Sequence, residues 1–67
     1  MFNEFVQVTE INGERMFINL SKIQWVREIS KGTEVPFSSI RVEDNTYQVR
    51  ETIESFEQFF EEQSSGD

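Results

Sequence analysis

The sequence predicts an α+β domain: a small, mostly antiparallel β-sheet of four to five strands, with one C-terminal amphipathic helix packed on one face. Three observations support this. Apolar residues alternate with polar ones through much of the first fifty positions, an Asn-Gly pair interrupts the alternation at positions 12 and 13, and the apolar spacing lengthens after position 51. Because the connections are short, the strands are expected to run antiparallel. We assign residues 1–63 to one domain and residues 64–67 to a disordered tail.

The first hairpin is predicted from residues 4–11 and 14–20, two β-branched and aromatic runs on either side of the turn. Asn12-Gly13 favours the positive backbone angles of a tight type I′ turn. A short corner is expected at residues 19–22.

Residues 23–29 are predicted to form a third strand whose alternation is imperfect, because Trp25 shares its parity with Ile23 whereas Val26 does not. A helical turn at its start or a β-bulge would reconcile the two. Pro36 cannot donate to a sheet ladder, so the chain around it is a strand edge, a bulge or a loop. Residues 38–42 and 46–50 alternate cleanly and are predicted to form the last two strands.

The helix is predicted to begin after Thr52, whose hydroxyl can cap a free amide of the first turn. Ile53, Phe56, Phe59 and Phe60 then fall within an arc of about 120° when placed on a helical wheel. This stripe is expected to face the sheet. The residues expected to fill the core are Val6, Val8, Met16, Ile18, Leu20, Ile40, Val42, Tyr47, Val49, Ile53, Phe56 and Phe60.

The composition argues against an enzyme. The chain has no Cys and no His, which excludes thiolate or imidazole metal sites and removes the commonest general base near neutral pH. The acidic pairs Glu43-Asp44 and Glu61-Glu62 fall in a predicted turn and on the solvent side of the helix, where a carboxylate is ordinary solvated charge and not a catalytic group. We therefore predict no catalytic residues, no metal and no cofactor.

The net charge of −7 is concentrated at the C-terminal end, because residues 51–67 hold 6 of the 13 acidic residues and none of the 6 basic ones. The acidic surface is expected at Glu54, Glu57, Glu61 and Glu62. It has three interpretations: a solvated face, a docking surface for a basic protein, or a mimic of nucleic-acid phosphates. Direct binding to nucleic acid is disfavoured by this charge.

The N-terminus has no signal-peptide pattern, and no apolar run is long enough to insert into a membrane. The expected location is therefore cytoplasmic.

The aromatic residues exceed what so small a core needs. Phe5 and Phe17 have the opposite strand parity to the core residues, and Phe2, Trp25 and Phe37 have no obvious place in it. Phe5, Phe17, Trp25 and Phe37 are therefore the candidate interface with a protein partner or with a second copy of the chain. The alternative is that loops or the N-terminal segment fold over them.

Four basic residues could lie on the sheet face away from the helix: Arg15, Arg27, Arg41 and Arg50. They would form either a positive stripe with Phe17 and Trp25 as stacking platforms for nucleic acid, or a mixed solvent face with cross-strand ion pairs.

Four segments carry a further pattern: residues 8–14 (VTEINGE), 18–23 (INLSKI), 40–42 (IRV) and 49–56 (VRETIESF). Together they resemble the small bacterial FlbD-type flagellar proteins, the SwrD group of swarming motility. Those proteins have a V-T-x-(L/I)-N-G-x opening, an (I/L)-N-x-x-x-I corner and a V-x-E-(S/T)-x-x-E-(V/I) helix entry. The resemblance implies a cytoplasmic accessory protein linked to flagellar function, without catalytic residues.

The sequence therefore predicts a non-catalytic bacterial interaction module that binds a protein or itself. The alternatives are a nucleic-acid-related protein, as an acidic mimic or a weak binder, and a minor phage or structural subunit.

Overall fold

The β1–β2 hairpin opens the fold in the computed structural model, which describes residues 4–64. The elements in chain order are β1 (Phe5–Thr9), β2 (Arg15–Asn19), η1 (a 3₁₀ turn, Leu20–Lys22), β3 (Ile23–Ile29), β4 (Phe37–Val42), β5 (Asn45–Val49) and α1 (Ile53–Ser64). β1 and β2 form one antiparallel sheet, and β3, β4 and β5 form a second in that order. The α+β prediction is confirmed. Helix α1 extends through Ser64, while residues 65–67 of the predicted tail and Phe2 lie outside the described residues.

The turn between β1 and β2 lies where Asn12-Gly13 predicts it, but it has three residues rather than two. Glu10 pairs with Glu14, whose carbonyl accepts from the Glu10 amide at 2.7 Å. Gly13 has a φ of +96°, and the Asn12 side chain accepts from the Glu14 amide at 3.0 Å. A single left-handed residue after Asn12 is the usual geometry of a three-residue hairpin loop, which explains the extra residue.

The irregularity predicted in β3 is present. The 3₁₀ turn η1 precedes the strand, and the register with β4 shifts between Ile23 and Trp25. After this shift Val26 lies opposite Ile40 on the inner face, and Trp25 lies opposite Arg41 on the outer face. The bulge therefore explains why Ile23 and Val26 both face the core despite their opposite parity.

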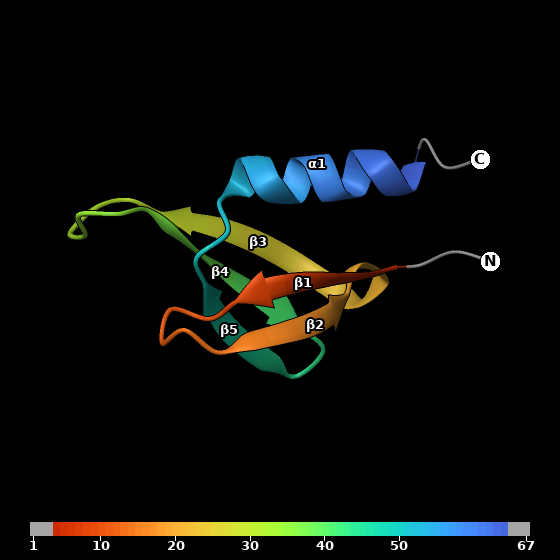
Figure 1. Cartoon of the computed structure of the whole chain (residues 1–67), viewed down its shortest axis with the longest axis horizontal. Helices are drawn as coiled ribbons and strands as arrows, with labels where there is room; N and C mark the ends of the chain where they lie inside the picture. Colours follow the sequence, from red (N-terminus) through yellow and green to blue (C-terminus); the bar gives the residue numbers. More distant parts are fainter. Residues whose placement is uncertain (1–3, 65–67) are drawn as a thin grey trace.

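The strands form two layers rather than one continuous sheet (Figure 1). β1 and β5 meet at their ends, where Glu10 and Val49 form a bridge. The Arg50 amide donates to the Thr9 carbonyl at 2.7 Å, and the Ile11 amide donates to the Gln48 carbonyl at 3.1 Å. Beyond this point the two Glu51 carboxylate oxygens accept from the Thr9 amide at 2.9 and 3.1 Å. The Glu51 carboxylate thus takes the place of the carbonyl that would continue the β1–β5 ladder, and the two sheets diverge.

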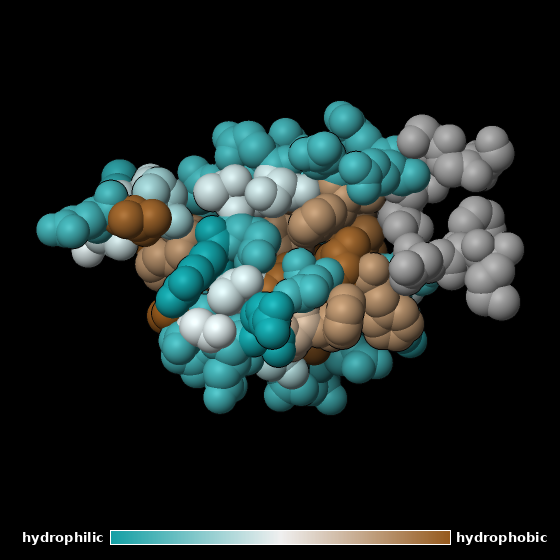
Figure 2. Space-filling model, viewed as in Figure 1, coloured by the Kyte–Doolittle hydropathy of each residue, from teal (hydrophilic) through white to brown (hydrophobic). Residues whose placement is uncertain are grey.

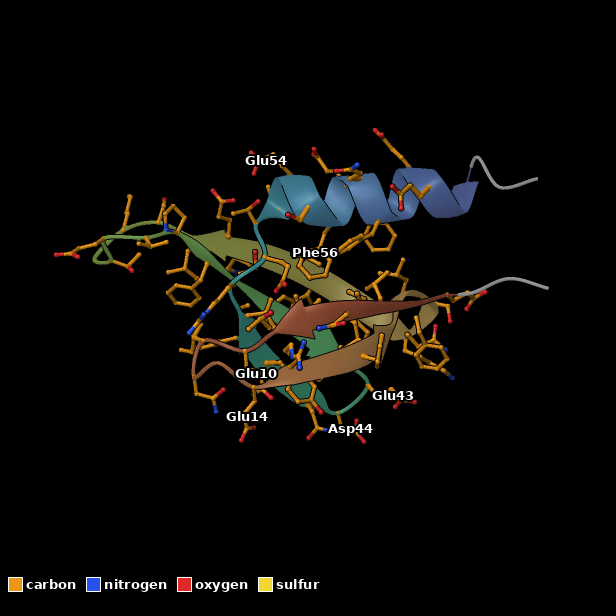
Figure 3. All side chains as sticks on the ribbon, viewed as in Figure 1. Glu10, Glu14, Glu43, Asp44, Glu54 and Phe56 are labelled. Carbon is orange, nitrogen blue, oxygen red and sulfur yellow. The ribbon has the colours of Figure 1, made fainter. Side chains whose placement is uncertain are left out.

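The core lies between the two sheets and is closed by α1 (Figure 1). Its buried apolar residues are Val8, Ile18, Leu20, Ile40, Val49 and Phe56. Phe56 is 1% exposed and points from the helix toward the sheets (Figure 3), with the Phe59 ring edge-on at 5.5 Å.

Phe60 is 40% exposed, so Phe59 and not Phe60 joins Phe56 in the helix seam. Phe60 lies at the rim of the core, where it lines a shallow hollow with Glu4, Leu20 and Ser21. The described helix is too short and too polar to cross a membrane.

Candidate functional site

The four aromatic residues predicted to form an interface lie on two different surfaces. Phe5 and Phe17 are on the outward face of the β1–β2 hairpin, where Phe17 is 68% exposed. Trp25 and Phe37 are on the outward face of the β3–β4–β5 sheet. They therefore cannot act as one patch, and each surface is considered separately.

Strand register brings arginine and aromatic residues together on the outer face of β3–β4–β5. One row across the three strands is Trp25, Arg41 and Thr46, and the next is Arg27, Ser39 and Gln48. Ile29 and Phe37 lie opposite each other in the third row. Together with Arg50, which follows β5, we call this surface the arginine–aromatic face: Trp25, Arg27, Ile29, Phe37, Arg41 and Arg50.

Each arginine of this face is held by a specific contact. The Arg27 guanidinium lies over the Trp25 ring at 5.0 Å from its centre, within the range of a cation–π interaction. Arg41 donates from Nε to the Glu43 carbonyl at 3.1 Å and from Nη1 to the Thr46 hydroxyl at 3.4 Å. Arg50 donates from Nη2 to the Ile11 carbonyl at 3.4 Å. Carbonyl and hydroxyl acceptors orient a guanidinium without neutralising its charge.

Two carboxylates of the sheet, those of Glu28 and Glu43, have contacts away from the rows of this face. Glu28 sits on the inner face of β3, opposite Ser38, and accepts from the Ile53 amide at 3.3 Å. Glu43 lies in the β4–β5 turn and forms an ion pair with Lys22 at 3.9 Å. None of the outward positions in the three rows above is Asp or Glu. The strand positions of this face therefore hold only arginine and uncharged residues.

A groove of about 500 Å³ adjoins this face at the end where Phe37 begins β4. Its walls are Ile11, Thr33, Val35, Pro36, Phe37 and Arg50. The Thr33 hydroxyl donates to the Val35 carbonyl at 2.9 Å, which fixes the loop, and the Val35 side chain is left 71% exposed. The groove thus combines apolar walls with one guanidinium, a chemistry suited to an apolar group beside a carboxylate.

The acidic surface predicted on the helix is present as a row of exposed side chains at Glu54, Glu57, Glu61 and Glu62. Figure 3 shows Glu54 pointing away from the sheets, and Figure 2 shows hydrophilic residues along the outer side of α1. Apolar surface lies below the helix in Figure 2, over the hairpin. The acidic surface thus lies on α1, whereas the arginine–aromatic face lies on β3–β4–β5.

Sequence reasoning placed Arg27, Arg41 and Arg50 on one face with Trp25. It left out Phe37, and it included Phe17, which lies on the hairpin. The parity that Phe37 shares with Arg41 on β4 is the signal that could have added Phe37 to this face. Arg15, the fourth predicted member, lies instead on the hairpin, opposite Thr9. The groove walls at Ile11, Val35 and Pro36 come from loops, whose path the apolar alternation does not predict.

Within residues 4–64, no cluster of three or more Asp and Glu side chains has the arrangement of a metal site. Comparisons with protein-family models, with curated proteins and with solved structures gave no match to this chain.

Proposed function

We propose that this chain is a small, non-catalytic protein-interaction module that binds a partner through the arginine–aromatic face. The observation that carries the proposal is the set of Arg27, Arg41 and Arg50 beside Trp25 and Phe37, on a face whose strand positions hold no carboxylate. Arginine and aromatic side chains are the residue types most enriched at the centres of protein interfaces. The preferred partner is a protein segment that carries carboxylates next to apolar side chains.

The charge and geometry favour a protein partner over nucleic acid. The chain has a net charge of −7, and long-range repulsion opposes a polyanion more than a short acidic segment. In addition, one side of the Trp25 ring is covered by Arg27, so a base would have to displace the guanidinium to stack there. We therefore expect oligonucleotides to bind more weakly than acidic peptides.

The row of glutamates on α1 supports a second contact, with a basic protein. The predicted result is salt-sensitive capture of a basic partner that is lost on combined Glu54→Gln, Glu57→Gln and Glu61→Gln substitution. Capture that is unchanged in the triple variant would remove the helix from the proposal. The cytoplasmic location and the flagellar association stay predictions from the sequence.

Trp25 is the single tryptophan of the chain and lies within the proposed face, so its fluorescence reports binding directly. The probe is a synthetic peptide in which Glu alternates with Leu and Phe, and its matched control has Lys in place of Glu. We expect the acidic peptide to shift the emission and the basic peptide to leave it unchanged.

Arg41→Gln and Arg50→Gln should each weaken peptide binding roughly ten- to a hundredfold, because an arginine–carboxylate hydrogen bond contributes about 1.5–3 kcal/mol. Arg15→Gln, which removes the same charge from the hairpin, should leave the affinity unchanged. Equal loss in all three variants would mean that only net charge matters, and tighter binding of a thymidine oligonucleotide would favour the nucleic-acid alternative.

A further inference from the structure

The second exposed surface, the hairpin, has an unpaired strand edge at β2. Among the described strands, β2 pairs with β1 alone. The Leu20 amide donates to the Glu4 carbonyl and the Glu10 amide to the Glu14 carbonyl, so the even-numbered residues of β2 direct their backbone groups toward β1. The backbone groups of Arg15 and Phe17 and the amide of Asn19 are therefore directed away from β1, whereas the Asn19 carbonyl belongs to the N-cap of the 3₁₀ turn η1.

Two of the other strand edges, on β1 and β3, carry features that hinder pairing. The Thr9 amide and carbonyl on the far side of β1 bond to Glu51 and Arg50. β3 has a register shift and a carboxylate on its inner face, at Glu28, and α1 packs beside it. Bulges, inward charges and covering elements are the usual protections of an edge. β2 has a regular five-residue register without a bulge or proline.

We propose that β2 pairs with β2 of a second copy of this chain, antiparallel and centred on Phe17, so that the two hairpins form a continuous four-stranded sheet. Centring the two-fold axis on Phe17 is the arrangement that pairs all five residues of β2. This inference is independent of the arginine–aromatic face, which lies on the other sheet.

Charge and side-chain size fit this register. Arg15 of each copy lies opposite Asn19 of the other, so the two positive charges do not face each other. Phe17 lies opposite Phe17 of the second copy. The Phe17 side chain is 68% exposed in the single chain, and this pairing covers part of it. A hollow of about 570 Å³ lined by Gln7, Glu14, Arg15, Met16 and Phe17 leaves room beside the strand. In the hairpin, β2 lies on the side away from α1 (Figure 1), so the acidic helices of the two copies stay far apart.

The area is small for a permanent dimer, and we therefore expect a weak, reversible association. Sedimentation equilibrium of the full chain over a roughly hundredfold range of concentration measures it. The expected result is a monomer at the low end and a rising fraction of dimer at the high end. A monomer at every concentration, or a closed oligomer larger than a dimer, would overturn the proposal.

The strand register is tested with Phe17→Pro, because proline removes an edge amide that bonds to nothing within the hairpin ladder. We expect Phe17→Pro to abolish the dimer, whereas Phe17→Thr keeps the amide and should only weaken it. A circular-dichroism melt at low concentration establishes that Phe17→Pro is folded. If it is unfolded, the charge variants below decide the matter.

Asn19→Asp keeps the side-chain oxygen that accepts from the Ser21 amide at 3.0 Å and places a carboxylate opposite Arg15 of the second copy. Two symmetric charge pairs should tighten the dimer roughly fivefold, and adding Arg15→Gln should cancel the gain. Failure of Asn19→Asp to tighten the dimer, or a gain that persists with Arg15→Gln, would rule out this register and favour another surface.

Discussion

Ser38 is a polar residue buried in the core. Its side chain is fully buried in the central strand β4, and its hydroxyl has no hydrogen-bond partner in the structure. Glu28, its neighbour across the strand, directs its carboxylate to the Ile53 amide instead. A buried hydroxyl without a partner costs about 1–3 kcal/mol of folding free energy.

Replacing Ser38 by Ala should therefore stabilise the protein. We expect Ser38→Ala to raise the free energy of unfolding by about 1 kcal/mol, because it removes the desolvated hydroxyl and opens only a small space. Urea denaturation followed by Trp25 fluorescence measures the change. Ser38→Thr, which keeps the hydroxyl, is the matched control and should not stabilise. A loss of stability in Ser38→Ala would mean that the hydroxyl is paired in solution.

At the scale of elements, α1 is attached to the sheets by carboxylates at its beginning. Glu28 accepts from the first helical amide, at Ile53, and Glu51 accepts from Thr9 just before the helix. Amides at a helix N-terminus lack partners within the helix, and the helix dipole favours negative charge there. Glu28 thus joins β3 to the helix across the edge of the core.

Removing the charge of Glu28 should loosen this junction. We expect Glu28→Gln to destabilise the fold by about 0.5–1 kcal/mol, because the amide still accepts a hydrogen bond but no longer interacts with the dipole as a charge. Glu57→Gln changes the net charge equally on the exposed side of α1 and should have little effect. Chemical denaturation of both variants makes the comparison, and equal effects would show that the position of Glu28 is unimportant.

The elements themselves could be predicted from the sequence because each has a local cause. Alternation defines the strands, Asn12-Gly13 defines the first turn, and the spacing of Ile53, Phe56 and Phe59 defines the helix. The separation into two sheets could not be predicted, since it depends on the Glu51 carboxylate taking the place of a ladder bond with Thr9. The exposure of Phe60 could not be predicted either, because a 120° stripe is wider than the contact the helix makes with the sheets.

For the candidate site, parity predicted that Phe5 and Phe17 face away from the core and that Arg27 and Arg41 share a face. It did not predict that the aromatics divide between two surfaces, because that division follows from the layering. The groove beside Phe37 needs the β3–β4 loop to fold back toward Ile11, a contact between segments far apart in the sequence.

At the scale of the whole molecule, a thin core depends on very few side chains. Six apolar residues are buried among those described, and Phe56 is the largest of them. A chain of this length has a total stability of only a few kcal/mol. The core therefore depends on the helix for its largest buried side chain, and we expect the sheets to be unstable without it.

Phe56→Ala should cost about 3–5 kcal/mol and leave the protein largely unfolded at 25 °C. Phe60→Ala removes the same ring from the same helix at a position that is 40% exposed, and it should leave a cooperative melting transition. Thermal melts by circular dichroism compare the two. Similar loss in both variants would show that the helix packs differently from the arrangement in Figure 3.

Peptide binding by the arginine–aromatic face is tested most directly by nuclear magnetic resonance mapping of the backbone amides and the Trp25 indole. On titration with the Glu-Leu-Phe peptide, we expect shifts concentrated on the arginine–aromatic face, including Phe37 and Arg50, with the hairpin and α1 unaffected. Shifts confined to α1 or to the outward face of β1–β2, or none at saturating peptide, would contradict it.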